Sequence, residues 1–159
     1  IKHAVFPDAR WRVRVTFGGA FMSFALTLGL YWVAPVLIAA RISPEAPPAL
    51  MASCVALHTL GVAVMMSADA QKHFALKASR TLITDGMFAR IRHPNYLGEM
   101  MIYASYALLA QHWLPWLILT WVWLAVFLPN MLMKEASLAR YPGWDEYRRR
   151  TGLLWPGKG

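Results

Sequence analysis

The residues of this chain that could do chemistry gather in one stretch, Thr84–Glu99, between long apolar segments. Asp85-Gly86 predicts a tight turn, because glycine accepts the positive φ that such turns need. Arg92 and His93 follow, and Pro94 is a favoured first residue of a helix. The unpaired backbone N–H groups of that helix would lie beside the two basic side chains. This arrangement predicts a site for an anion, either a phosphate or a carboxylate.

The helix expected after this proline carries polar residues along one face. Asn95, Glu99, Tyr103 and Tyr106 lie at offsets of 0, 4, 8 and 11 residues, which share one side of an α-helix. A carboxylate at the mouth of a membrane helix is costly unless it has partners. Glu99 is therefore a candidate catalytic residue, and Tyr103 is the second. A plainer interpretation is that the basic cluster and the first helical turn only solvate a helix end at the membrane surface.

The composition indicates an integral membrane protein. Of the 159 residues, 58% are hydrophobic and 15% are charged, which is more apolar side chain than a soluble domain of this length can bury. The net charge of +8 predicts no nucleic-acid partner, because the basic residues lie beside the ends of the apolar segments. The single cysteine, Cys54, excludes a disulfide framework and a thiolate metal cluster, and we expect a small buried hydrophobe there.

The pattern predicts an all-α, polytopic membrane helix bundle with about four transmembrane helices, since a span needs roughly 20 apolar residues. The expected spans are Thr16–Ala40, Ala49–Ala68, about Asn95–Gln111 and about Pro115–Met133. Polar, aromatic and helix-breaking residues over 111–116 separate the last two, which should form a tight helical hairpin. Tyr31 and Trp32 are expected in an interfacial aromatic belt. His58 is expected to hydrogen-bond a neighbouring helix.

We expect a single membrane domain over 1–159. An interfacial segment at 1–15 precedes four spans within 16–133, and these enclose a basic loop at 69–93. A cytosolic tail at 134–159 follows and contains a short amphipathic helix, Trp144–Arg150. Because the chain begins with Ile1 and shows no signal-peptide pattern, we expect that N-terminal helices are missing from it.

The distribution of basic residues predicts the topology. Fifteen of the 16 Lys and Arg residues precede the first span, lie in the basic loop or follow the fourth span. The connection between the first two spans holds only Arg41, and the hairpin turn holds none. Four spans with both termini and the basic loop on the cytoplasmic side satisfy this distribution. The expected location is a bacterial inner membrane.

The sequence has no G-x-G-x-x-G fingerprint, no P-loop and no His, Cys, Asp or Glu set at metal-ligand spacing. We therefore expect no metal, and any nucleotide would be held in a cleft of the helix bundle. A charged cofactor would enter from the cytosol, between the basic loop around Arg92 and the tail. A lipophilic substrate would enter from the lipid bilayer, toward the polar stripe of Asn95–Tyr106.

Five runs in the second half of the chain resemble the C-terminal region of steroid 5α-reductases, especially bacterial relatives of that family. They are Ser67–Lys72, Asp85–Phe88, Arg92–Glu99, Lys134–Tyr147 and Leu154–Pro156. The resemblance implies a helical membrane bundle that holds NADPH from the cytosolic side. It also implies hydride transfer to the enone double bond of a steroid-like lipid.

The same resemblance implies the site residues. Asn95 and Glu99 match the residues of the family's Asn-aromatic-Leu-Gly-Glu run that contact NADPH. Asp69 matches the aspartate that ends the preceding span, and Met65 stands where the family has an asparagine. The full set of cofactor-binding candidates is Asp69, Arg92, His93, Asn95, Tyr96, Glu99, Lys134, Tyr141, Tyr147 and Arg148.

Two other hypotheses remain open. The Arg-His-Pro-x-Tyr-x-Gly run also resembles isoprenylcysteine carboxyl methyltransferases and phospholipid N-methyltransferases. In those families the same cleft would hold S-adenosylmethionine, and Glu135 would match an acidic residue just after the last span. The runs Ala68–Lys72 and Gly98-Glu99 favour the reductase. The third hypothesis is a non-enzymatic small membrane subunit, whose tryptophan and methionine side chains face lipid and partner membrane proteins.

Overall fold

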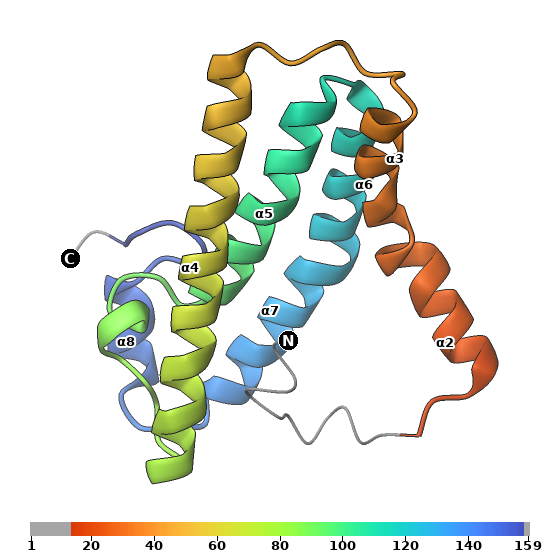
Figure 1. Ribbon diagram of the computed structural model, residues 1–159. Helices are drawn as coiled ribbons and strands as arrows, with labels where there is room; N and C mark the ends of the chain where they lie inside the picture. Colours follow the sequence, from red (N-terminus) through yellow and green to blue (C-terminus); the bar gives the residue numbers. More distant parts are fainter. Residues whose placement is uncertain (1–13, 158–159) are drawn as a thin grey trace.

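The computed structural model describes residues 14–157, and the regular secondary structure there is helical (Figure 1). The helices are α2 Phe17–Ser23, α3 Val33–Ala39, α4 Pro48–Ala78, α5 Pro94–Ala110, α6 Trp113–Val122, α7 Leu128–Leu138 and α8 Trp144–Arg150. The all-α prediction is confirmed. The predicted interfacial segment at 1–15 lies outside the described residues, apart from its last two.

Within the described residues, three helical stretches are long and apolar enough to cross a membrane, by length and composition. They are Phe17–Ala39, Pro48–Ala78 and Trp113–Leu138. The first is interrupted by a π-helical turn at Phe24–Leu28 and a 3₁₀ turn at Leu30–Trp32, and α6 joins α7 through a π-helical turn at Trp123–Phe127. The remaining predicted span, the third in chain order, corresponds to α5, which has 17 residues, the lower limit for crossing a bilayer, so the count of four is approximate.

The helix ends follow local sequence signals. Pro94 is the first residue of α5, as predicted, and its fixed φ and missing N–H suit that position. The hairpin turn is also confirmed: α5 ends at Ala110, and Gln111 adopts a left-handed conformation with a φ of 46°. The His112 side chain then accepts a hydrogen bond from the Leu114 N–H at 3.1 Å and caps α6.

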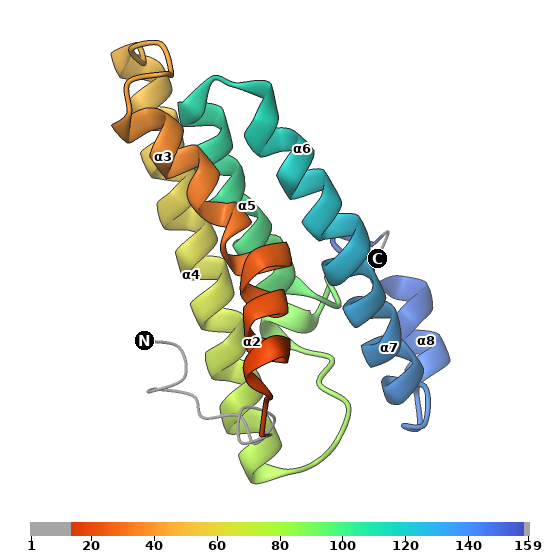
Figure 2. The same cartoon turned by 90° about the vertical axis from the view of Figure 1, so that its right-hand side faces the viewer.

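The connections gather at two opposite ends of the bundle (Figures 1 and 2). The loop 40–47 and the hairpin turn lie together at one end, where Gln111 Nε2 donates to the Pro44 carbonyl oxygen at 3.2 Å. The C-terminal end of α4, the N-terminal end of α5 and α8 lie toward the other end. The basic loop and the tail therefore share one end, which we call the polar end.

α4 and α5 pack backbone against backbone, because glycines face each other. A Cβ atom added at Gly98 would lie 2.6 Å from the Gly61 carbonyl oxygen, and one at Gly61 would lie 2.8 Å from the Gly98 oxygen. Small residues permit this close approach between membrane helices. Farther along the same pair, His58 Nδ1 lies 3.3 Å from Ser105 Oγ, which confirms the expected interhelical hydrogen bond.

The described core is small, and much apolar surface faces outward. Val122, Phe127 and Met131 form its centre. Cys54 is 4% exposed and packs as a small hydrophobe, as expected. Large apolar side chains such as Trp121 (54% exposed) and Leu124 (61% exposed) instead point away from the bundle. An outer surface of this kind suits a lipid bilayer.

Candidate functional site

Arg92 ties the start of α5 to α7 and to the tail. Its Nε and Nη2 atoms donate to the two carboxylate oxygens of Glu135, the second at 3.4 Å. Its Nη1 atom donates to the backbone oxygens of Arg148, at 3.2 Å, and Thr151. The Arg92 side chain is 9% exposed. The guanidinium is thus engaged inside the protein, where it stabilises the buried Glu135 carboxylate and the end of α8.

His93 lies against the same carboxylate. The residue is 4% exposed, and its Nε2 atom lies 3.5 Å from Glu135 Oε1. Burial lowers the His93 pKa to about 4. The negative charge of Glu135 opposes that shift, whereas the positive charges of Lys134 and Arg92 add to it. The imidazole is therefore neutral at physiological pH.

The tail pairs with the loop before α5 through backbone hydrogen bonds. The Arg92 N–H donates to the Gly152 oxygen at 2.9 Å, and the Gly152 N–H donates to the Arg90 oxygen at 3.0 Å. The His93 N–H donates to the Leu153 oxygen at 3.1 Å. This short parallel pairing holds the backbone around Arg92 and His93, the candidates for the anion site, against the tail. A sequence pattern reports only neighbouring residues, so it gave no sign of this pairing.

Tyr147 fastens α8 to the basic loop. Its side chain is buried, and its hydroxyl donates to the Phe88 carbonyl oxygen at 2.8 Å. Burial raises the pKa of the phenol to about 12, against the opposing effect of Arg92, so the phenol remains a donor. Of the predicted tail residues, Tyr147 thus has a clear structural role, and Arg148 contributes its backbone oxygen to Arg92.

Lys134 and Tyr96 contact each other beside the Arg92–Glu135 pair. The Lys134 ammonium donates to the Tyr96 hydroxyl at 3.0 Å and lies 4.4 Å from the centre of its ring. The Tyr96 ring packs edge-to-face on Phe127, with 5.0 Å between ring centres. These contacts link five predicted site residues near Glu135, which lies in the run Lys134–Tyr147 but is not among the cofactor-binding candidates. Its position directly after Lys134, at the end of the last span, is the available sequence signal. The five are Arg92, His93, Tyr96, Lys134 and Arg148.

The predicted turn at Asp85-Gly86 is present and is fixed from α4. Gly86 has a φ of 54°. Gln71 Nε2 donates to the Asp85 carbonyl oxygen at 2.9 Å, and Gln71 Oε1 accepts from the Met87 N–H at 2.8 Å. Two of the runs that carried the family resemblance therefore meet in space. This contact fixes the basic loop against the polar end of α4, where Asp69 lies half-buried.

The polar face of α5 enters the bundle. Asn95, Glu99 and Tyr103 are half-buried, and the Tyr31 ring of the first span stacks on Tyr103 with 3.7 Å between ring centres and 5° between planes. The Tyr31 hydroxyl is buried and has no hydrogen-bond partner among the described residues. The expectation of an interfacial Tyr31 is wrong, whereas Trp32 is 64% exposed. In the sequence Tyr31 lies well inside its span rather than at an end, and this position could have indicated that it packs within the bundle.

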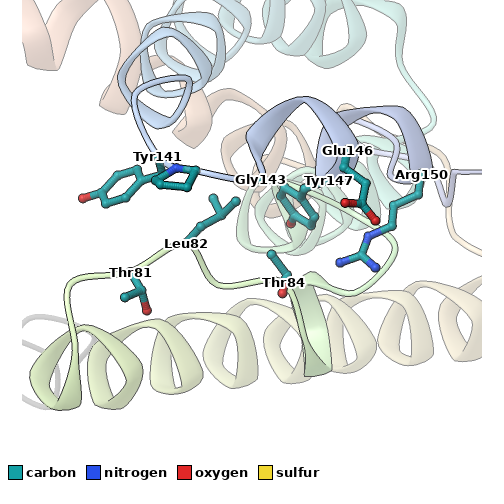
Figure 3. A pocket seen from close by; sticks show the side chains of 9 residues that line it. Thr81, Leu82, Thr84, Tyr141, Gly143, Glu146, Tyr147 and Arg150 are labelled. Atoms are coloured by element: carbon teal, nitrogen blue, oxygen red, sulfur yellow. The ribbon is translucent and has the colours of Figure 1, made fainter.

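A cavity of about 420 Å³ opens at the polar end, between the loop after α4 and the tail (Figure 3). This volume is typical of small-molecule and cofactor sites. The lining residues are Thr81, Leu82, Thr84, Tyr141, Pro142, Gly143, Glu146, Tyr147 and Arg150. Tyr141 and Tyr147 are predicted cofactor-binding residues, whereas Thr81, Thr84, Glu146 and Arg150 are not among the predicted site residues. These four come from a loop and a helix that only the fold brings together.

The chain is similar to a family described as "Protein of unknown function (DUF1295)", whose sequence profile matches residues 8–151. Two uncharacterized proteins of the yeast Schizosaccharomyces pombe are also similar. The first is 45% identical over 58 residues, which cover 36% of this chain and 19% of that protein. The second is 31% identical over 91 residues, which cover 54% of this chain and 26% of that protein.

The chain thus spans about a fifth to a quarter of the length of the curated relatives that it matches. No solved structure is significantly similar to it.

Proposed function

We propose a function from the premise that this chain belongs to the DUF1295 family, which is related to steroid 5α-reductase-like membrane proteins. The function is NADPH-dependent reduction of a carbon–carbon double bond in a lipid enone, such as a steroid-like ketone. The polar end faces the cytosol, in agreement with its basic residues, and the membrane predicted from the sequence is a bacterial inner membrane.

The observation that carries the proposal is the polar face of α5. Asn95, Glu99 and Tyr103 are half-buried on consecutive turns that run from the polar end into the bundle, where Tyr31 stacks on Tyr103. Buried polar groups in a membrane bundle are costly and mark sites of function. This face could direct a cofactor from the cytosol toward a lipid between the helices.

The residues present fit NADPH in two respects. The polar end offers a cavity of about 420 Å³, whose lining includes the Arg150 guanidinium and hydroxyl side chains together with the Glu146 carboxylate. The α5 face offers a carboxylate, Glu99, which can accept a hydrogen bond from the nicotinamide carboxamide. NADPH, when bound, would supply the hydride.

The protein's own side chains would orient the reactants. Glu99 would fix the nicotinamide ring toward Tyr103 and Tyr31. The buried Tyr31 hydroxyl, a donor with no partner among the described residues, would donate to the carbonyl oxygen of the enone. That hydrogen bond would stabilise negative charge as it develops on the oxygen.

Glu99→Gln tests the proposal, because it keeps the shape of the side chain and removes its charge. We expect hydride transfer to fall by about 10²-fold, the usual cost of losing one preorganised polar group. NADPH should still bind, but more weakly. Glu45→Gln, in the exposed loop at the opposite end, is the matched control and should change neither quantity. NADPH binding and enone reduction are measured on protein that includes any preceding helices.

A methyltransferase is the second candidate, and Glu135 favours it. This carboxylate matches the acidic residue after the last span of those enzymes and lies against Arg92 and His93 of the shared run. If S-adenosylmethionine stabilises the wild-type protein and millimolar NADPH does not, the methyltransferase hypothesis replaces the reductase hypothesis. Binding of neither cofactor would instead support a non-enzymatic membrane subunit with partner proteins.

A further inference from the structure

Two buried hydrogen-bond donors lie within the apolar spans without an acceptor among the described residues. They are the Tyr31 hydroxyl and the Trp123 indole N–H, and both atoms are shielded from solvent. The indole N–H can only donate, so an acceptor is the single partner that satisfies it. Inside a membrane there is no bulk water to supply that acceptor. Buried donors of this kind indicate a place where a ligand oxygen binds.

The two donors come from different helical stretches but pack on the same core. Tyr31 and Trp123 both lie against the buried cluster of Val122, Phe127 and Met131. The 3₁₀ turn that carries Tyr31 also contacts α6, the helix that ends next to Trp123. Each donor lies near the middle of its apolar stretch, well away from both ends. One ligand group at this depth of the bundle can therefore serve both.

Each donor also lies where its helix departs from α geometry. Tyr31 is the middle residue of the 3₁₀ turn between α2 and α3, and Trp123 is the first residue of the π-helical turn between α6 and α7. Turns of these two kinds inside a long helix are frequent at functional sites. The Tyr31 ring is held by its stack on Tyr103. The fold thus places both side chains without using their donors.

The acceptor that suits this place is a neutral oxygen with two lone pairs. A carboxylate or phosphate would bring a charge into the middle of the membrane, which is costly. A lipid hydroxyl accepts hydrogen bonds, but it brings a further donor that needs an acceptor of its own. A ketone oxygen accepts two hydrogen bonds and donates none. The two donors therefore favour a lipid ketone over a lipid alcohol.

We propose that Trp123 is a substrate-binding residue, which donates a second hydrogen bond to the carbonyl oxygen that Tyr31 contacts. The assignment of that oxygen to an enone rests on the proposed function. The indole N–H keeps its proton, so Trp123 orients the carbonyl group and stabilises negative charge on its oxygen. The inference deepens the proposed reductase by adding a residue that selects ketones.

The test compares the binding of cholestenone with that of cholestene, which has the same ring skeleton without the carbonyl oxygen. Affinities are measured without NADPH, on detergent-purified protein that includes any preceding helices. We expect the wild type to prefer cholestenone. Trp123→Phe and Tyr31→Phe should each reduce that preference about five- to tenfold, as expected for the loss of one hydrogen bond.

The comparison of two ligands separates hydrogen bonding from packing. The smaller ring of Trp123→Phe weakens the packing around both ligands alike, so the preference changes only through the carbonyl oxygen. Trp121→Phe is the matched control, because Trp121 is exposed on α6. The infrared carbonyl band of bound cholestenone is a second measurement. Each hydrogen bond lowers its frequency, so Trp123→Phe should raise it and Trp121→Phe should not.

The outcomes distinguish this inference from the proposed function. If Trp123→Phe leaves the preference and the carbonyl band unchanged, Trp123 has no such role, even if NADPH reduces an enone. Equal affinity of the wild type for both ligands would overturn the carbonyl site. A preference that both substitutions reduce, in a protein that does not bind NADPH, would support the carbonyl site and overturn the reductase. Wild-type protein that neither binds the two ligands nor reduces cholestenone would overturn both.

Discussion

At the scale of single residues, Glu135 is the centre of the polar end. Glu135 is 9% exposed, and its carboxylate contacts both Arg92 and His93. The neighbouring Lys134 donates a hydrogen bond to the Tyr96 hydroxyl. A buried charge of this kind is tolerated only where its partners stay in place. Arg92 and His93 of the Arg-His-Pro run therefore stabilise the folded protein through their contacts with Glu135.

The neutral state of His93 gives a prediction about acid stability. In the unfolded chain a histidine has its ordinary pKa of about 6.5. In the folded protein the His93 pKa lies at about 4, chiefly because of burial. The unfolded state binds more protons between these values, so the free energy of unfolding falls as the pH falls through that range. The loss amounts to about 3 kcal/mol by pH 4.

Thermal unfolding in detergent at pH 7 and pH 4.5 measures this effect. The melting temperature of the wild type should fall between these pH values, and His93→Gln should reduce the fall because it cannot take up the proton. His73→Gln is the control, on a half-buried α4 residue that packs against Phe74. Equal acid sensitivity of wild type and His93→Gln would contradict the prediction.

At the scale of helices and loops, the glycine contact between α4 and α5 positions the polar face of α5. Gly98→Ala would place a methyl group 2.6 Å from the Gly61 carbonyl oxygen and the Met65 nitrogen. The two helices must separate to admit it, and overpacking of this kind costs about 1–3 kcal/mol. We expect a lower melting temperature, accompanied by weaker cofactor binding because Glu99 is the next residue.

Gly18→Ala is the matched control for this packing change. Gly18 lies in α2, and a Cβ atom there would have no neighbour within 4 Å. The methyl group should therefore leave the melting temperature unchanged or raise it slightly, because alanine favours a helix over glycine. A Gly98→Ala protein as stable as Gly18→Ala would mean that α4 and α5 are not in backbone contact.

Local signals allowed much of the fold to be predicted from the sequence. Pro94, the breakers at 111–116 and the acidic start of α8 each act within one or two helical turns, and the helix ends agree with them. The predicted span Ala49–Ala68 is shorter than the observed helix, because α4 continues to Ala78. Hydropathy reports where a helix leaves the lipid, and it does not report where the helix ends.

Contacts between distant segments could not be predicted in this way. The Tyr31–Tyr103 stack, the Arg92–Glu135 pair and the pairing of Arg90 with Gly152 each join parts of the chain that no local pattern relates. The site residues named from the sequence were mostly those of contiguous runs. Those missed, such as Glu146 and Arg150, become site residues only because α8 folds over the basic loop.

At the scale of the whole molecule, exposed aromatic side chains mark both ends of the bundle. Trp113 is 67% exposed beside the hairpin turn, and Trp155 is 79% exposed in the tail that pairs with the basic loop. Tryptophan is enriched at both surfaces of a bilayer. We therefore expect the two ends of the protein to lie at the two membrane surfaces, and the basic residues to distinguish one surface from the other.

This arrangement predicts that accessibility alternates along the chain. Single cysteines at Glu45 and His112 should be labelled from one side of the membrane, because their loops lie at the same end of the bundle (Figure 1). Cysteines at Ser79 and Arg149, on exposed positions of the polar end, should be labelled from the other side. The background carries Cys54→Ala, and a membrane-impermeant maleimide is added to sealed vesicles and then to opened ones. The positive-inside rule makes the Ser79 and Arg149 side cytoplasmic. Labelling of Glu45→Cys and Ser79→Cys from the same side would mean that α4 does not cross the membrane, and the predicted topology would then be wrong.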